Sequence, residues 1–195
     1  RINSGIYIKR EDELAGHGSK TRKYASLIPF LKRRGFREVL VIGSANSNHV
    51  VQVTQLLIQN RIKPILFLKK THSGTHKGNS LLIRLLVAEP QIQWLNRIEW
   101  LEVKRIASEY ALERREQGFS CYILEEGASD PNSLAGAMTL FQDICQNEIS
   151  QQIEFQHILV DAGTGFTAIA LILANSLLKA NKQIHVVQMA GSQED

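Results

Sequence analysis

Cysteine is scarce in this chain of 195 residues, which contains only Cys121 and Cys145. Two cysteines cannot build the dense disulfide framework that stabilises small secreted domains. The chain also lacks a run of about 20 apolar residues, the length that a membrane-spanning helix needs, because Gly163 and Gly165 interrupt its most apolar stretch. No charged-then-apolar leader opens the sequence. From these absences we expect a cytoplasmic protein with no membrane partner.

Strong bias toward one charge is also absent, since the net charge is only +4. The charges are nevertheless unevenly placed: residues 1–105 carry 19 basic and 7 acidic side chains, and residues 106–195 carry 4 basic and 12 acidic ones. A basic half can indicate nucleic acid or a phosphorylated ligand. No series of aromatic side chains is spaced along the densest basic cluster, residues 32–37, as base stacking requires. We therefore expect no nucleic-acid partner.

With 44% hydrophobic residues the chain has enough apolar surface to fold. Short β-rich runs alternate with longer helical ones. The expected strands are residues 6–8, 39–42, 64–68, 98–103, 121–124, 157–160 and 184–189. Helices are expected between them, at residues 21–34, 48–59, 81–86, 105–117, 133–147 and 167–180. Strands that are apolar on both faces and separated by helices predict an α/β protein with mostly parallel, twisted sheets flanked by helices.

Ligands of such folds bind beyond the carboxyl ends of the strands, which directs attention to the strand-to-helix junctions. At residues 161–168, Gly163 and Gly165 let backbone N–H groups converge at a helix N-terminus, and Thr164 and Thr167 add hydroxyl groups. This is a candidate phosphate cradle, although a tight turn with a threonine cap explains it equally well. The segment also matches the Gly-x-Gly-x-x-Ala fingerprint of dinucleotide-binding folds, but the next expected strand ends without the required acidic residue.

A second junction, residues 43–49, is rich in small polar side chains. Ser47 or Asn48 could simply cap the following helix, and His49 could be an ordinary turn histidine. Alternatively, the cluster presents neutral hydrogen-bonding groups to a polar ligand. The residues alone leave both interpretations open.

The third junction, residues 16–23, places Lys20 after a glycine pair at the start of a helix. A helix N-terminus disfavours a positive charge, so we expect a lowered pKa for this lysine. Such a lysine can serve as a Schiff-base amine and as a general base. The alternative is a solvated loop lysine.

Metal binding is not expected from this sequence. His72 and His76 are four residues apart, but they flank Gly74 in a polar loop without a cysteine or carboxylate cluster. A Ser–His–acid triad would also lack its nucleophile elbow.

Five segments in register resemble one family, that of 1-aminocyclopropane-1-carboxylate (ACC) deaminase and D-cysteine desulfhydrase. They are residues 9–12 with 18–24, residues 47–49, residues 78–82, residues 126–129 with 132–137, and residues 163–167. Members of this family are pyridoxal-phosphate enzymes of fold type II, related in fold to the tryptophan synthase β subunit. The resemblance covers nearly the whole chain.

The resemblance implies a role for each matched residue. Lys20 would hold pyridoxal 5'-phosphate through a Schiff base and act as the general base. Lys23 would approach the cofactor phosphate. The phosphate would be bound largely by backbone N–H groups of Gly163, Thr164, Gly165, Phe166 and Thr167.

Three further roles follow from the same resemblance. Asn48 would hydrogen-bond the phenolic oxygen of the cofactor ring. Ser47, together with Asn48 and His49, would meet the substrate carboxylate, and Ser47 would assist at the carbon skeleton as a catalytic residue.

The function implied is that of a homodimeric lyase that deaminates or β-eliminates a small amino acid such as D-cysteine or ACC. One alternative is a catalytically impaired cofactor-binding protein, because Ser19 stands where many relatives have asparagine and Val51 and Gln52 occupy a region that often holds an arginine. A dinucleotide-binding oxidoreductase is a weaker alternative. The resemblance also implies two domains: a smaller α/β domain at residues 40–145, and residues 1–39 with 146–195 as parts of a larger cofactor-binding domain whose C-terminal remainder is absent.

Overall fold

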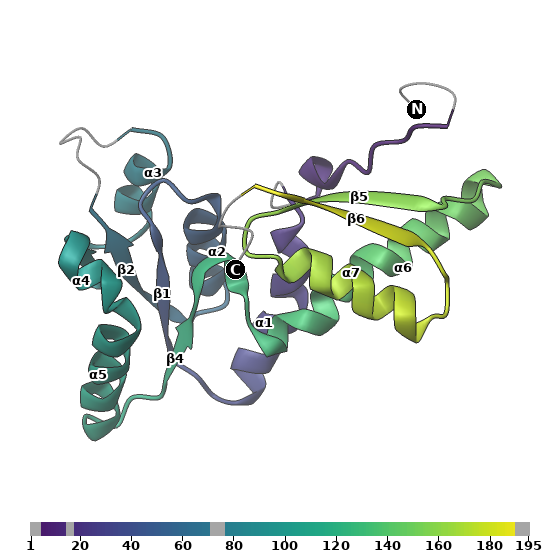
Figure 1. Ribbon diagram of the computed structural model, residues 1–195. Coiled ribbons are helices and arrows are strands. Elements are labelled where there is room, and N and C mark those ends of the chain that lie inside the picture. The colour runs from purple at the N-terminus through teal and green to yellow at the C-terminus, as the bar shows by residue number, and fades with distance from the viewer. Residues whose placement is uncertain (1–4, 15–17, 71–76, 190–195) are drawn as a thin grey trace. The chain divides into compact units, whose positions relative to one another are not determined.

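A computed structural model describes residues 5–14, 18–70 and 77–189 of the chain, and Figure 1 shows the order of its elements. The chain divides into two compact units: the first unit contains residues 1–26 and 131–195, and the second unit contains residues 27–130. The boundaries expected from the sequence, after residues 39 and 145, differ from these. The observed boundaries fall within helix α1 (Lys20–Arg33) and just before helix α6 (Leu134–Gln151), so that α6 belongs entirely to the first unit.

The second unit is built on a four-stranded parallel sheet with the strand order β3-β2-β1-β4. Its strands are β1 (Glu38–Ser44), β2 (Lys63–Lys69), β3 (Ile92–Leu95) and β4 (Cys121–Leu124). Its helices are α2 (Asn48–Gln59), α3 (Asn79–Leu86), α4 (Arg97–Leu101) and α5 (Val103–Glu116). Short 3-10 turns lie at η2 (Glu89–Gln91) and η3 (Glu126–Ala128). The central strands β1 and β2 are buried on both faces, as the sequence predicts.

Helices cover both faces of this sheet (Figure 1). Leu40, Ile42 and Phe67 form a core cluster against which Trp100 of α4 and Tyr110 of α5 pack. Helix α2 packs against β1 and β2. Because the strands are parallel, their carboxyl ends lie at one edge, and the turn from β1 to α2 is held at that edge.

The first unit has a two-stranded parallel sheet of β5 (His157–Ala162) and β6 (Gln183–Gln188). It also contains α6, α7 (Phe166–Leu177), the start of α1, η1 (Glu11–Glu13) and η4 (Pro131–Ser133). Phe141 of α6 and Leu171 of α7 form a core against which Ile158 of β5 and Ile184 of β6 pack. The other face of this sheet, with Leu159 of β5 and Val187 of β6, is exposed within the described residues.

The strand expected at residues 98–103 is wrong, since these residues form α4 and the start of α5. Asn96 caps α4: its Oδ1 accepts hydrogen bonds from the N–H groups of Ile98 and Glu99, at 2.8 and 3.0 Å. The Glu99 carboxylate accepts the N–H of Asn96 at 2.7 Å and completes a capping box. The strand of this region is β3, which begins six residues before the expected strand and pairs with β2.

The strand expected at residues 6–8 is also wrong. Ile6 makes an isolated bridge, and Tyr7 and Ile8 have no regular structure. The isoleucine side chains are 56% and 60% exposed, so nothing in their packing favours a strand, whereas the Tyr7 ring packs edge-on against Phe155 at 5.2 Å.

Helix α3 forms where the leucine pattern predicts it, but with a different buried face. Leu81, Leu82 and Leu85 are exposed, and Ile83 is fully buried instead. Leucine spacing therefore predicted the helix correctly, whereas the packing of α3 against α2 determined which side faces inward.

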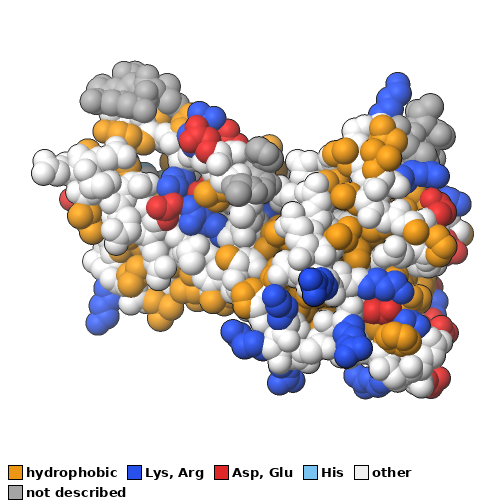
Figure 2. Space-filling view, turned by 180° about the vertical axis from the view of Figure 1, so that it is seen from behind, with side chains coloured by type: hydrophobic (Ala, Val, Ile, Leu, Met, Phe, Trp, Pro, Cys, Tyr) orange, Lys and Arg blue, Asp and Glu red, His pale blue; other side chains and the backbone are white. Residues whose placement is uncertain are grey.

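Figure 2 shows lysine and arginine side chains at several places on the surface, some of them beside acidic side chains. Among the helices of the described ranges, none combines the length and apolar composition that crossing a bilayer requires.

Glu38, the first residue of β1, is the most heavily paired buried charge of the second unit. Its carboxylate is 2% exposed and accepts two hydrogen bonds from Arg114, at 2.8 and 2.6 Å, and one from Lys63 at 3.1 Å. Chiefly through the Arg114 hydrogen bonds, the pKa of Glu38 is lowered to about 2. The carboxylate therefore joins β1, β2 and α5 at the amino ends of the strands.

The change Glu38→Gln is expected to lower the free energy of unfolding at neutral pH by about 3 kcal/mol, because it leaves the largely buried Arg114 guanidinium without its carboxylate partner. The wild type should lose this contribution as the pH falls from 4.5, the ordinary value, towards 2, since the unfolded carboxyl takes up its proton first. Urea unfolding from neutral pH down to pH 2 measures both effects. Glu125→Gln is the control, because Glu125 forms an exposed ion pair with Lys104. This variant should change the free energy of unfolding by less than about 1 kcal/mol.

Candidate functional site

The predicted site residues lie at the junctions expected from the sequence and belong to both units. Lys20, Lys23 and the glycine turn, which we define as residues 163–167, belong to the first unit. Ser47, Asn48 and His49 belong to the second. Each group is described within its own unit.

Lys20 is the first residue of α1 and is partly buried. Buried apolar side chains hold the helix, among them Tyr24, Leu27 and Leu31. Lys23 lies three residues after Lys20, so the two lysines share one face of the helix. The amine proposed for covalent chemistry and a second lysine are therefore neighbours.

Lys23 and the glycine turn are brought together by the fold. The Lys23 Nζ atom lies 4.7 Å from the centre of the Phe166 ring, although 143 residues separate them in the sequence. The side chain is only 2% exposed. Burial, with a smaller effect from the charge of Lys20, lowers the pKa of Lys23 from 10.5 to about 8. A lowered pKa was not predicted for Lys23 from the sequence.

The glycine turn has the backbone geometry of an anion site. Gly165 adopts a left-handed conformation, with φ of 73°, and directly precedes α7. The N-cap residue Gly165 has no side chain to cap α7, so it leaves the N–H groups of the first helical residues available to a ligand or to solvent. A Cβ atom at Gly163 would meet nothing within 4 Å, so a ligand has room beside the backbone. Lys23 supplies a cation to the same turn through Phe166.

Thr21 is a further polar residue at this end of α1 that sequence reasoning did not single out. Its Oγ1 atom is buried and has no hydrogen-bond partner among the described residues. A buried hydroxyl without a partner is costly, and a bound polar group would relieve that cost. Only its position directly after Lys20 could have drawn attention to it.

In the second unit, the turn from β1 to α2 is compact. A Cβ atom at Gly43 would lie 2.5 Å from Val50, so glycine is needed for α2 to pack against the end of β1. Ser47 occupies the N-cap position of α2, but its side chain makes no capping hydrogen bond. The simple capping interpretation of Ser47 is therefore wrong. His49 is buried in the first turn of α2, whereas Ser47 and Asn48 are more accessible.

Asn79, at the start of α3, fixes the orientation of the Asn48 amide. Its Nδ2 donates to the backbone carbonyl of Asn46 at 3.0 Å and to Oδ1 of Asn48 at 2.6 Å. Because the Asn48 oxygen is engaged in this way, its NH₂ group is the part left to donate to a ligand. Asn79 lies within residues 78–82, one of the segments that resemble the family, but no role was predicted for it, since 31 residues separate it from Asn48.

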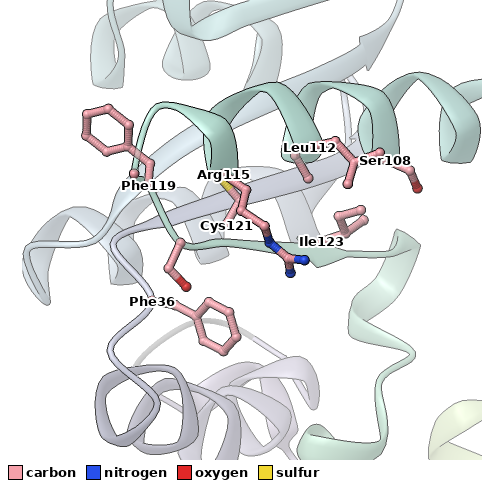
Figure 3. A pocket seen from close by; sticks show the side chains of 10 residues that line it. Phe36, Ser108, Leu112, Arg115, Phe119, Cys121 and Ile123 are labelled. Carbon is pink, nitrogen blue, oxygen red and sulfur yellow. The ribbon is translucent and has the colours of Figure 1, made fainter.

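A hollow of about 450 Å³ lies at the opposite end of the second unit's sheet. Figure 3 shows it beside α5, with Phe36, Cys121 and Ile123 along it and the Arg115 guanidinium extending over it. It contains none of the predicted site residues, because it adjoins the amino ends of β1 and β4 and not their carboxyl ends.

For the residues that the structure describes, no group of three or more histidine, cysteine or carboxylate side chains could hold a metal. His72 and His76, which the sequence argument considered, lie outside the described residues.

Comparison with known proteins identifies the family. The model for pyridoxal-phosphate dependent enzymes matches residues 1–194. The chain belongs to this family. The dinucleotide interpretation of the glycine turn is therefore not supported, and pyridoxal 5'-phosphate is the cofactor of the family.

Relatives of the chain include two enzymes named in the expected group. A putative ACC deaminase of Thermotoga maritima is 31% identical over 193 residues, which are 97% of this chain and 60% of that protein. A D-cysteine desulfhydrase of Serratia proteamaculans is 24% identical over 169 residues, which are 83% of this chain and 50% of the relative. The chain thus spans 60% or less of the length of these relatives.

Solved structures confirm the α/β fold expected from the sequence. An ACC deaminase homologue superimposes with a TM-score of 0.83 at 26% identity, over 95% of this chain and 56% of that chain. Threonine deaminase isoform 2 from Solanum lycopersicum gives a TM-score of 0.67 at 18% identity, over 94% of this chain and 47% of that chain, which shows a likeness of fold alone.

The first unit's residues fit the cofactor. An uncapped helix N-terminus, open space beside Gly163 and the Lys23 cation suit a phosphate group. Lys20 is the amine three residues before Lys23, and Thr21 has a buried hydroxyl without a partner among the described residues. The glycine turn and Lys23 would thus hold the phosphate, and Lys20 would attach to the aldehyde.

The change Lys23→Met is expected to raise stability in the absence of phosphate, by up to about 3 kcal/mol at neutral pH, because no ammonium group has to be buried. The wild type should gain stability as the pH rises from about 8 to 10.5, since over this range the unfolded lysine binds more protons than the folded one. Urea unfolding at several pH values measures this slope. The variant should lack it, and Lys32→Met, at the other end of α1, should retain it. An equal slope in wild type and Lys23→Met would contradict the assignment.

Proposed function

We propose that this protein is a pyridoxal-phosphate-dependent enzyme that deaminates or β-eliminates a small amino acid, of the D-cysteine desulfhydrase or ACC deaminase type. The observation that carries the proposal is the contact between Lys23 and Phe166, which joins the lysine pair of α1 to the glycine turn. The names of the relatives support the reaction class.

The cofactor, when bound, supplies an electron sink that stabilises negative charge at the substrate carbon. The protein must then hold the phosphate, present an amine and move a proton. Lys23 and the backbone N–H groups of the glycine turn would hold the phosphate, because cation and helix N-terminus both favour an anion.

Lys20 would supply the amine that anchors the cofactor. Once the amino group of the substrate takes its place, Lys20 would become the base that removes the α-proton of a substrate such as D-cysteine. Its position three residues before Lys23 places this amine on the same face of α1 as the cation proposed to hold the phosphate.

The second unit would contribute hydrogen bonds. Asn48 would donate its NH₂ group to the phenolic oxygen of the cofactor, an orientation consistent with the Asn79 hydrogen bond. Ser47, whose hydroxyl is not used as a helix cap, would meet the substrate carboxylate. For ACC, which has no α-proton, Ser47 would assist ring opening. The buried His49 stays a predicted substrate-binding residue. Homodimer formation and a cytoplasmic location belong to the same proposal.

Loss of Lys20 tests the proposal directly. The natural protein mixed with pyridoxal 5'-phosphate is expected to develop an absorbance band near the visible edge, and the Lys20→Ala variant should not, because Lys20 is the amine proposed to bond the aldehyde. The holoenzyme should convert D-cysteine to pyruvate or ACC to 2-oxobutyrate, with release of ammonia in both cases. A band that survives Lys20→Ala unchanged would refute the role of Lys20. A Lys20-dependent band without either product would leave the catalytically impaired alternative.

Removal of Asn79 tests the orientation of Asn48. Asn79→Ala is expected to weaken cofactor binding by about three- to tenfold, the effect of one lost hydrogen bond, as measured by titration of the visible band. Asn48→Ala should weaken it similarly, and the double variant should be little worse than either, because both changes disrupt one interaction. Asn60→Ala, at the other end of α2, is the matched control and should bind normally. Fully additive losses in the double variant would show that Asn79 does not act through Asn48.

A further inference from the structure

The first turn of α1 is electrostatically unfavourable by its own sequence. It contains three cations, Lys20, Arg22 and Lys23, and no acidic residue, although the N-terminus of a helix repels positive charge. Carboxylates must therefore come from elsewhere in the fold if this helix start is to be held in one position.

Arg22 brings two carboxylates to this helix start. Its guanidinium donates two parallel hydrogen bonds to Glu11 of η1, at 2.7 and 2.8 Å, and a third to Asp143 of α6 at 2.6 Å. The Arg22 and Glu11 side chains are only 12% and 15% exposed. Lys9 extends the network, because its Nζ lies 2.6 Å from the same Asp143 oxygen. A planar fork bound on both sides fixes orientation better than a single ion pair.

The backbone of α1 is held at the same point. A Cβ atom at Gly136 of α6 would lie 2.0 Å from the Arg22 carbonyl oxygen, so the two helices approach as closely as backbones allow. The Ser26 hydroxyl donates to the Asn132 carbonyl at 2.7 Å and accepts the Gly136 N–H at 3.0 Å. We name these contacts of Arg22 and Ser26 the α1 clamp. In Figure 1, α1 and α6 are seen to meet at this end of α6.

We propose that Arg22, through its bonds to Glu11 and Asp143, is a positioning residue that fixes the rotation of α1 and thereby directs Lys20 to the cofactor aldehyde and Lys23 to its phosphate. The inference rests on the proposed function. Arg22 points to a different side of the helix from the two lysines, so it holds the helix without occupying the lysine face. The Glu11 and Asp143 carboxylates pair with Arg22. Among the ion pairs of the described residues, none involves the Lys20 amine.

Borohydride trapping measures lysine positioning without turnover. Pyridoxal 5'-phosphate added to the natural full chain condenses with a lysine amine, with loss of water, and borohydride reduces the resulting carbon–nitrogen double bond to a stable amine. Peptide mass spectrometry then gives the ratio of label at Lys20 to label at Lys23. In the wild type we expect Lys20 to carry most of the label.

The variants Glu11→Gln, Asp143→Asn and Arg22→Met loosen the α1 clamp to different degrees. We expect the Lys20-to-Lys23 ratio to fall by about tenfold in Arg22→Met, because small displacements of a reacting group have effects of this size, and by less in the two milder variants. Arg22→Lys, which keeps the charge but loses the fork, should restore part of the ratio. Arg10→Gln is the control: this arginine of the same segment pairs with Asp12 outside the clamp.

Thermal unfolding of each variant separates positioning from stability. A reduced ratio in variants that melt near the wild-type temperature supports the proposal. Lower melting temperatures with an unchanged ratio overturn it and assign Arg22 a purely structural role. If Arg22→Met does not fold, the label ratio and the melting temperature of Glu11→Gln and Asp143→Asn are compared in the same way and decide between the two outcomes. A wild type without preference for Lys20 overturns the proposed function together with this inference, whereas a preference that persists in every variant overturns the inference alone.

Discussion

The close approach of α1 to α6 is the contact on which the first unit's part of the site depends. Gly136 lets the α6 backbone reach the Arg22 carbonyl, and no residue with a Cβ atom fits there without displacing one of the helices. Once the two helices are in contact, the Arg22 guanidinium reaches both Glu11 and Asp143. The direction of the lysine pair on α1 is a consequence of this packing.

Burial then lowers the pKa of Lys23, the second lysine of the pair. A lysine at the start of a helix is disfavoured by the helix dipole, and Lys23 is in addition removed from water. The Phe166 ring compensates for part of this cost by contact with the ammonium group. The same features that make the cation costly in the empty protein make the turn attractive to an anion. A phosphate group would satisfy the α7 N-terminus and Lys23 at once.

The second unit follows a different constraint, the burial of a parallel sheet on both faces. Because β1 and β2 are apolar throughout, polar side chains of this region can collect only where the strands end. The turn before α2 is such a place, and Gly43 keeps it tight against Val50. The Asn79 hydrogen bonds then fix the turn and the Asn48 amide from a separate helix. At the other end of the sheet, Glu38 and Arg114 form a buried ion pair that has no part in the proposed chemistry.

The sequence by itself determined the alternation of strands and helices, the parallel character of the sheets and the junctions at which Lys20, Ser47 and the glycine turn lie. These depend on local periodicity and on glycine and polar residues after apolar runs, which can be recognised within a few residues. The capping box of Asn96 and Glu99 is equally local, and it indicates that a helix and not a strand begins at this point of the chain. Only the tertiary structure decided that Ile83 and not the leucines of α3 faces inward, that Lys23 lies on Phe166, that Asn79 orients Asn48, and that Arg22 binds Glu11 and Asp143. Except for the pair of Arg22 and Glu11, these contacts join residues of distant elements, and their burial and geometry arise only when the elements pack.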